Sequence, residues 1–364
     1  MRTAAVVPFS AVAATKANSA VTVGIIGFGG RGSSHGRHLS SLPQAKLVSV
    51  ADVSDESIER GRQKVSLDGV RIHRDLNDVL ASDVDAVIIA TPVYMHPDHF
   101  EAAIQAGKHI YIEKPAAADI AGAKKVMRLA DAAPRHLNIT FGYQQRHGAV
   151  YHAAKRLIDS GEIGKINLVH SHFLKSGMTG KERALPPPRN ESERLAQWKR
   201  WRSTYGEIIT ETFCHNIDAM NWFAGSHPVK AIGTGGRSVM KVGDLLDHLN
   251  VTYDYPGNVQ GNMVGSYLSP SFYREVYERY FCDDGVVETA RGYWKHYRGR
   301  NDVVEERSPH DITIDALEEF FGRIRDGNPA NTGVRGAEST LTALLGQMAI
   351  DRRTEVTWDE MMAS

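Results

Sequence analysis

The sequence is poor in features that mark several classes of protein. Its 364 residues include only two cysteines, Cys214 and Cys282, too few for a disulfide framework or a cysteine-rich zinc site. Because 43 lysines and arginines balance 43 aspartates and glutamates, no global basic field favours nucleic acid or an anionic membrane as a partner. No stretch approaches the roughly 18 apolar residues of a spanning helix. The remaining composition is that of a globular enzyme, long enough for two domains with separate cores.

The first twenty residues differ from the rest in composition. Met1 and Arg2 precede a short apolar stretch of small residues that runs to Ala20. These are the parts of a secretory leader. One interpretation is the end of an export signal whose basic front lies upstream, which predicts a periplasmic protein. The other is a disordered extension on a cytoplasmic enzyme. Under both, residues 1–20 lie outside the fold.

A glycine-rich turn follows the first apolar run, Val21–Ile26. It reads Gly27-Phe28-Gly29-Gly30-Arg31-Gly32. A second apolar run ends in Asp52, twenty residues further on, which is the spacing of a dinucleotide-binding turn. In such a turn the first glycine permits the tight bend, the next lets the backbone approach a pyrophosphate, and the last allows close packing. Free N–H groups at the helix start would face the phosphates. The alternative is an ordinary strand-to-helix turn that needs glycine for its backbone angles.

Residues 21–142 alternate apolar strands with helical patterns. This alternation predicts a doubly wound parallel sheet with a ligand at the carboxyl ends of its strands. The predicted strands are Val21–Ile26, Lys46–Ala51, Val70–Ile72, Val84–Ala90, His109–Ile112 and Asn138–Gly142, and the predicted helices include Asp75–Ala81, Pro97–Ala106 and Ile120–Ala132.

Residues 143–364 follow another pattern, in which strands alternate in polarity. This favours an α+β domain with a large, mostly antiparallel open sheet. Asp283-Asp284-Gly285 suits a hairpin turn, and Met178–Arg194 is predicted to be a loop because it is rich in proline and charge. The predicted strands are Lys165–Phe173, Val229–Gly233, Asp247–Tyr255, Val259–Ser266 and Glu278–Cys282, and the predicted helices are 151–159, Ile312–Arg325 and Val334–Arg352.

Lys114 directly follows the apolar strand His109–Ile112, in the sequence Glu113-Lys114-Pro115. That position lies at the carboxyl end of a strand, where the cofactor is expected. A lysine there can stabilise negative charge that develops on a substrate oxygen. The alternative is a solvated surface lysine.

A second group of chemically active residues lies further along the chain. Glu211, His215 and Asp218 are spaced so that a helix would place them on one face. A histidine with a carboxylate one turn away on each side can act as a general base, because a carboxylate can orient the ring. It can equally be a core histidine beside surface acids. A metal site with His170 or His172 is a third option, although the spacing matches no specific metal motif and we predict no metal.

The chain resembles the family of glucose-fructose oxidoreductase and inositol dehydrogenase. The matching residues are Gly27–Gly32, Asp52, Thr91-Pro92 with His96, Gly107-Lys108-His109, Glu113-Lys114-Pro115, Gly161-Glu162-Ile163-Gly164 and the pair His215 and Asp218. The resemblance implies a Rossmann domain, then a domain whose open sheet often forms an oligomer contact, so a homodimer or homotetramer is expected. It also implies hydride transfer between a nicotinamide ring and a carbon of a sugar or polyol.

The resemblance also assigns roles to residues. Lys114 would polarise the reacting oxygen and His215 would move its proton, with Glu211 as a third catalytic residue. The implied cofactor contacts are Gly27, Phe28, Gly29, Gly30, Arg31, Gly32, Asp52, Thr91, Pro92, His96, Glu113 and Lys114. The expected substrate contacts are Arg146, Tyr143, Asp218 and Arg202.

Three positions depart from the family pattern, and a fourth bears on cofactor choice. Glu211 and Phe213 replace the usual aspartate and glycine, which should reshape the pocket, and Val93 replaces a common asparagine. Asp52 suits a ribose 2′-hydroxyl better than a 2′-phosphate, so we expect NAD rather than NADP.

Three functions follow. The first is an NAD-dependent sugar or polyol dehydrogenase. The second is a glycoside hydrolase that oxidises its substrate transiently, eliminates, adds water and reduces again, with Glu211, Tyr143 and Tyr205 as further acid/base groups. The third is a non-catalytic binding protein, against which the presence of both Lys114 and His215 argues.

Overall fold

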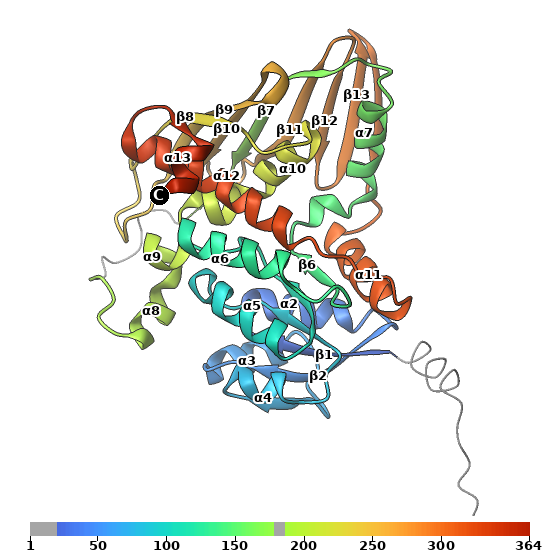
Figure 1. Cartoon of the computed structure of the whole chain (residues 1–364), viewed down its shortest axis with the longest axis vertical. Helices are drawn as coiled ribbons and strands as arrows, with labels where there is room; N and C mark the ends of the chain where they lie inside the picture. The colour runs from blue at the N-terminus through green and yellow to red at the C-terminus, as the bar shows by residue number, and fades with distance from the viewer. Residues whose placement is uncertain (1–19, 178–185) are drawn as a thin grey trace, which may run out of the picture.

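A computed structural model describes residues 20–177 and 186–364. The leader-like segment, apart from Ala20, lies outside the described residues, as does the part of the predicted loop at 178–185. The described chain forms two layered α/β units, one above the other in Figure 1, and the predicted fold class is confirmed.

The first unit contains a six-stranded parallel sheet in the order β3-β2-β1-β4-β5-β6. Every predicted strand is present, with each boundary within two residues of the expected one. The strand order reverses between β1 and β4, which is where a doubly wound sheet binds its ligand. The strands are β1 Val21–Ile26, β2 Ala45–Ala51, β3 Arg71–His73, β4 Ala86–Ile89, β5 His109–Ile112 and β6 Ile139–Phe141, and the helices are α2 Gly30–Leu39, α3 Asp55–Arg62, α4 Leu76–Leu80, α5 His96–Gln105 and α6 Ile120–Asp131.

The second unit contains a nine-stranded sheet in the order β14-β13-β12-β11-β7-β10-β9-β8-β15. Its pairs are antiparallel except β7 with β10, which run parallel. The predicted hairpin turn at Asp283-Asp284-Gly285 joins β11 to β12, and the four strands that follow the turn, β12 to β15, were not among the predicted strands. The strands are β7 Ile166–Leu174, β8 Lys230–Gly236, β9 His248–Tyr255, β10 Val259–Ser266, β11 Glu275–Cys282, β12 Val286–Ala290, β13 Tyr293–Gly299, β14 Asp302–Arg307 and β15 Val356–Thr357.

Helices connect the two units. In Figure 1, α10 and α12 lie between the large sheet and the first unit, where α12 contacts both α6 and β8. The prediction of a loop over Met178–Arg194 is wrong at its end, because α8 begins at Glu191. The helices are α7 Ala149–Asp159, α8 Glu191–Gln197, α9 Arg202–Tyr205, α10 Cys214–Ala224, α11 Ile312–Arg325, α12 Gly333–Arg352 and α13 Trp358–Ala363, and shorter helical turns lie at Val93–Met95, Gln144–Arg146, Trp198–Arg200, Ile209–Phe213 and Pro256–Asn258.

Helix α11 returns to the first unit and completes its core. Phe320 and Phe321 are fully buried and belong to the cluster that includes Val23 and Ile25 of β1. The ring of Phe320 also packs edge-on against Tyr111 of β5, with 5.7 Å between centroids. The first unit therefore depends on a helix from the far end of the chain.

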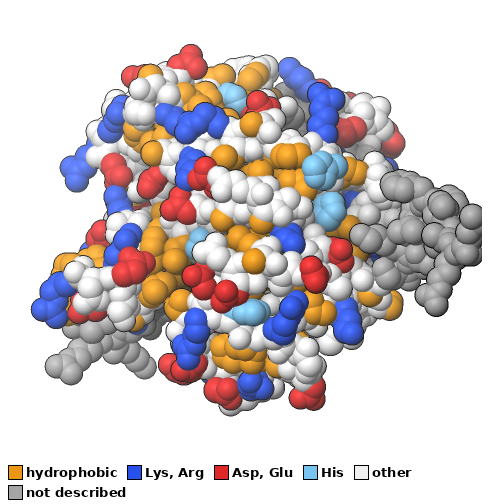
Figure 2. Space-filling model, turned by 60° about the horizontal axis from the view of Figure 1, so that its bottom comes forward, with side chains coloured by type: hydrophobic (Ala, Val, Ile, Leu, Met, Phe, Trp, Pro, Cys, Tyr) orange, Lys and Arg blue, Asp and Glu red, His pale blue; other side chains and the backbone are white. Residues whose placement is uncertain are grey.

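The surface carries charges of both signs. Figure 2 shows acidic and basic side chains interspersed over the face that it presents, in agreement with the formal net charge of zero. No helix in the described part of the chain combines the length and the apolar character needed to cross a membrane.

Candidate active site

The glycine turn after β1 has the geometry expected of a dinucleotide cradle. Gly27 has φ +84°, and a Cβ there would lie 2.8 Å from the backbone of Ala90, so only glycine fits without strain. A Cβ on Gly32 would lie 1.9 Å from the carbonyl oxygen of Gly27. By contrast, an added Cβ on Gly29 or Gly30 would meet nothing within 4 Å. The turn is closed on the protein side and open on the side where a pyrophosphate would approach.

Asp52 lies beside this turn, immediately after β2. One carboxylate oxygen accepts the N–H of Phe28 at 2.7 Å, and the other accepts the N–H of Ser54 at 2.9 Å. A carboxylate has about four lone-pair sites, so both oxygens keep acceptor capacity. Asp52 therefore fixes the turn and can still accept from a ribose hydroxyl.

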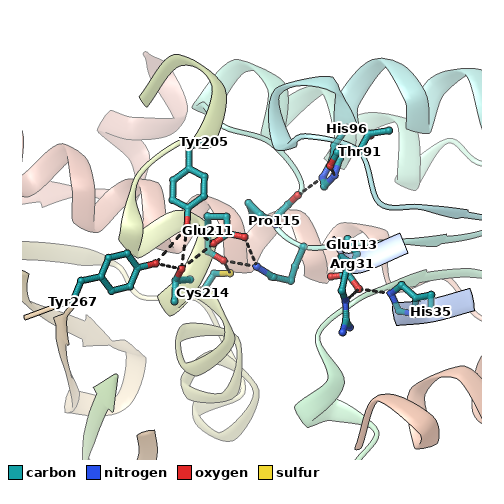
Figure 3. A network of polar contacts seen from close by, with 12 residues as sticks. Arg31, His35, Thr91, His96, Glu113, Pro115, Tyr205, Glu211, Cys214 and Tyr267 are labelled. Atoms are coloured by element: carbon teal, nitrogen blue, oxygen red, sulfur yellow. Dashed lines mark hydrogen bonds and ion pairs between the residues drawn. The ribbon is translucent and has the colours of Figure 1, made fainter. Parts of the chain in front are cut away.

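Glu113, which directly follows β5, joins the end of that strand to the glycine turn and to α2. It is 5% exposed and accepts the Nε of Arg31 and the Nε2 of His35, each at 2.7 Å (Figure 3). Burial alone would raise the pKa of the carboxyl, but Arg31 and His35 outweigh it and hold that pKa well below its usual value. Burial lowers the pKa of His35 to about 4. A neutral His35 therefore donates Nε2–H to an ionised Glu113.

His96 holds together the loops that follow β4 and β5. Its ring is fully buried, with Nδ1 2.7 Å from the carbonyl oxygen of Pro115 and Nε2 2.9 Å from that of Thr91 (Figure 3). Both ring nitrogens are thus used within the protein. His96 positions the loop that carries Lys114 and has no atom left for a ligand.

Lys114 and Glu211 form an ion pair between the two units. Lys114 Nζ lies 3.1 Å from Glu211 Oε1, and it also donates to the backbone carbonyl of Glu211. The other carboxylate oxygen accepts the hydroxyls of Tyr205 at 2.6 Å and Thr212 at 2.8 Å. Tyr267 is hydrogen-bonded in turn to Thr212, so three hydroxyls gather around Glu211 (Figure 3).

The ion pair fixes the charges of both partners. Burial opposes the charge on Glu211, but Lys114 and the hydroxyl donors outweigh it and lower the pKa of Glu211 to about 2. Burial would likewise lower the pKa of Lys114, but Glu211 outweighs it and raises that pKa above 10.5. Both groups therefore stay charged at neutral pH.

A π-helical turn, Ile209–Phe213, carries Glu211, and α10 begins at Cys214. The expected regular helix through Glu211, His215 and Asp218 is therefore wrong at its first residue, because the wider turn interrupts the register. Phe213, which the sequence suggested would reshape the pocket, is fully buried. Its ring packs against Phe173 and lies where a Cβ on Gly265 would be, 2.1 Å from the ring.

His215 is held by packing. Its Nδ1 is buried and has no hydrogen-bond partner among the described residues, and its ring lies edge-on to Tyr143, 6.1 Å between centroids. Burial and the positive charge of Lys114 keep its pKa well below 6.5. The imidazole is therefore neutral near pH 7 and can accept a proton.

Asp218 has a different partner from the expected one. Its two oxygens lie 2.9 and 2.8 Å from Arg146 Nε, and Ser339 donates to it at 2.7 Å. Since Glu211 is bound to Lys114, the expectation that flanking carboxylates orient the ring of His215 is wrong. Asp218 and Arg146 instead form a largely buried ion pair with each other.

Two family models match most of the described chain. Residues 21–141 match the oxidoreductase family with an NAD-binding Rossmann fold, and residues 151–288 match the C-terminal domain of GFO/IDH/MocA proteins. The chain belongs to the GFO/IDH/MocA family of oxidoreductases. Its first unit is accordingly an NAD-binding Rossmann domain, and the glycine turn and Asp52 lie where that domain binds its cofactor.

Curated relatives in this family include two inositol 2-dehydrogenases. That of Streptomyces avermitilis is 31% identical over 205 residues, which are 56% of this chain and 53% of the relative. That of Rhizobium meliloti is 26% identical over 238 residues, 64% of each chain. The chain thus spans little more than half the length of these relatives.

Solved structures with the same fold cover nearly the whole chain. Levoglucosan dehydrogenase in complex with NADH and levoglucosan has a TM-score of 0.79 at 16% identity, over 93% of this chain and 99% of that one. The apo scyllo-inositol dehydrogenase from Lactobacillus casei has a TM-score of 0.72 at 21% identity, over 93% and 98%. At these identities the likeness shows the fold alone.

Within this GFO/IDH/MocA chain, Arg202 is already engaged. It donates to Glu207 at 2.7 Å and to Asp351 at 2.9 Å. The other predicted substrate contacts lie near His215: Tyr143 against its ring, and the pair of Arg146 and Asp218 one helical turn on. Substrate contact remains a prediction for all four.

The sequence did not single out Thr212, Tyr267 or Lys175. Tyr267 and Lys175 each follow the end of a predicted strand by one or two residues, and the strands pair so that the N–H of Lys175 donates to Ser266. Their positions just after two strands could have indicated that Tyr267 and Lys175 lie close together, but only once the pairing of β7 with β10 was known.

No group of three or more histidine, cysteine or acidic side chains suited to a metal ion occurs in the described residues. His172 instead lies 2.9 Å from Glu275, and the ring of His170 packs edge-on against Phe281.

Proposed function

We propose that the protein is an NAD-dependent dehydrogenase that transfers a hydride between the nicotinamide ring and a carbon of a sugar or polyol. The observation that carries the proposal is the position of Lys114, which forms an ion pair with Glu211 and acts electrostatically on His215. The lysine comes from the carboxyl edge of the NAD-binding sheet, and the other two come from the second unit. The names of the relatives, inositol 2-dehydrogenases, support the substrate class.

The residues around the glycine turn fit the cofactor. The open side of Gly29 and Gly30 and the start of α2 would hold the pyrophosphate, and Asp52 would accept from the adenosine ribose. When bound, NAD supplies a hydride acceptor. The acidic Asp52 favours NAD over NADP, because a 2′-phosphate would meet a carboxylate.

Lys114 and His215 have separate roles in the proposed reaction. As a substrate hydroxyl becomes a carbonyl, its proton must leave and negative charge develops on the oxygen. Nδ1 of His215 is buried without a partner among the described residues, and we assign the other ring nitrogen, Nε2, as the acceptor of this proton. A histidine of low pKa is a weak acceptor by itself. The fixed charge of Lys114 compensates, because it stabilises the oxygen as the proton departs.

Glu211 acts through Lys114. Because it is ionised and bound by two hydroxyls and the ammonium group, it keeps Lys114 charged and fixes its direction. We propose it as a positioning residue, whereas the resemblance assigned it a catalytic role.

The test is incubation of the purified protein with NAD and a panel of sugars, polyols and glycosides. Net formation of NADH with one of them, lost in His215→Ala and retained in the exposed control His136→Ala, is the expected result. Release of an aglycone without net NADH would replace the proposal by the glycoside hydrolase. If no compound reacts while NAD still binds, a non-catalytic binding protein replaces it.

A further inference from the structure

Three basic side chains lie beside the ion pair of Lys114 and Glu211 and have no part in the mechanism above. They are Lys175, which follows β7, Lys199 in the turn Trp198–Arg200, and Arg274, which precedes β11. We call them the cationic rim. Their charges meet at Lys175, since Arg274, Lys199 and both members of the ion pair all act on its ammonium group.

Lys175 is the member of the cationic rim that lies over Tyr267, one of the side chains gathered around Glu211. Its ammonium group lies over the ring of Tyr267, 4.8 Å from the centroid, and 5.7 Å from that of Phe173. Tyr267 is hydrogen-bonded to Thr212, and Thr212 donates to Glu211. Two hydrogen bonds and one ring therefore separate Lys175 from the carboxylate that holds Lys114.

The rim lacks negative charge of its own. In the described part of the chain, none of its three members forms an ion pair or a side-chain hydrogen bond; each lies over an aromatic ring instead, Lys199 at 5.2 Å from Trp198 and Arg274 at 5.7 Å from Phe173. Burial and the neighbouring cations lower the pKa of Lys175, while Glu211 only partly opposes them. Glu211, which acts on the ammonium group of Lys175, already forms an ion pair with Lys114.

A neutral sugar would leave these charges without partners. Lys175 is half-buried, and a half-buried cation without a partner costs free energy unless a ligand or water satisfies it, whereas Lys199 and Arg274 are exposed to water. A carboxylate or a phosphate ester matches such a rim, because hydrogen bonds between charged groups are the strongest that side chains make.

We propose that the cationic rim binds an anionic group of the substrate, a carboxylate or a phosphate ester distant from the reacting carbon. The substrate class is then a sugar acid or a sugar phosphate. The inference rests on the proposed function, and Lys175 becomes a residue that determines specificity, while Lys114 and His215 act on the reacting hydroxyl.

The test compares neutral sugars with their anionic counterparts: glucose with glucuronate and glucose 6-phosphate, and galactose with galacturonate and galactose 6-phosphate. Binding to the NADH-loaded protein is measured by calorimetry, and turnover by NADH formation with NAD. We expect an anionic member to bind about tenfold or more tightly than its neutral counterpart, and to lose that advantage in high salt. The acid and phosphate arms decide which anion the rim prefers.

Variants of Lys175 locate the effect. Lys175→Met keeps the length of the stem and removes the charge, so the ratio of kcat/KM for anionic over neutral substrate should fall about tenfold, mainly through KM. Lys175→Arg should restore most of the ratio. Lys46→Met removes an exposed charge on β2 and should leave the ratio unchanged.

Two results would overturn the inference. One is that no anionic member binds more tightly than its neutral counterpart; the other is that Lys175→Met lowers binding of both classes equally. Absence of turnover with every compound would contradict the proposed function, and the calorimetric comparison would still decide whether the rim selects anions.

Discussion

Replacement of Glu211 by glutamine should remove a pH-dependent part of the stability of the protein. The substitution keeps the size of the side chain and removes the charge that faces Lys114. A fall of the Glu211 pKa from its usual 4.5 to about 2 corresponds to about 3 kcal/mol of stabilisation at pH 7. Because the native-state pKa is lowered, this stabilisation is complete above about pH 4.5 and is lost as the pH falls toward 2.

The measurement is denaturant unfolding of both proteins at several pH values between 7 and 3. The free energies of unfolding should differ most at pH 7. About 2 kcal/mol of that difference should be gone by pH 3, where the carboxyl has bound its proton in the unfolded state while the native state still holds it mostly ionised. Glu56→Gln, which changes an exposed glutamate, is the control and should behave as wild type.

The result that would refute this reasoning is a difference between wild type and Glu211→Gln that stays constant from pH 7 to pH 3. The carboxylate would then not be held ionised by Lys114. A second measurement supports the same argument: Lys114 loses the partner that raises its pKa, so turnover of the variant should fall at lower alkaline pH than that of wild type.

Other expected outcomes follow from the same geometry. His215→Ala and Lys114→Ala should each lower turnover by about 10²–10⁴-fold with NAD binding retained, and the double variant should lose less than the sum; near-normal turnover in either single variant would contradict the mechanism. Asp52→Ser should shift cofactor preference toward NADP, as titration of both cofactors would show, and tighter NADP binding by wild type would contradict the assignment. Asp218→Asn leaves the cation of Arg146 without its charge partner and should cost about 3 kcal/mol in denaturant unfolding, whereas an unchanged midpoint would show that the ion pair is not stabilising.

The first domain could be predicted from the sequence because its signals are local. Its strands are continuous apolar runs that are buried on both faces, as in β4, whose four residues are all buried. The glycine turn is equally local, since the constraints on Gly27 and Gly32 come from the turn itself and from the strand beside it.

The end of the large sheet could not be predicted in the same way. Strand β14 is almost entirely exposed and carries charged residues on both faces, so neither an apolar run nor an alternation marks it. Helix α8 buries no residue and was hidden by the prolines before it. Its start did have a signal: Asn190 accepts the N–H of Glu193 at 2.9 Å, which is an N-cap that the pattern of asparagine followed by glutamate predicts.

Several residues of the candidate site were named from the sequence, but the sequence did not predict which of them pair with one another. Spacing placed Glu211 with His215, whereas the structure places it with Lys114, because a π-helical turn breaks the register before α10. A single π-helical turn has no sequence signature strong enough to overrule regular spacing. Lys114 also lies 97 residues before Glu211 in the chain, so only the fold could bring these two together.

The charge states of the side chains around Lys114 determine which of them can accept a proton at neutral pH. Burial raises the pKa of the Cys214 thiol to about 12, and burial together with Glu211 raises those of Tyr205 and Tyr267 above 10, so all three stay protonated at neutral pH. Glu211 stays ionised and is bound by three donors. Among these groups around Lys114, His215 is the remaining neutral acceptor. The hydroxyl network therefore holds the charge of Lys114 in place, and in the proposed mechanism the proton that accompanies each hydride would pass through His215.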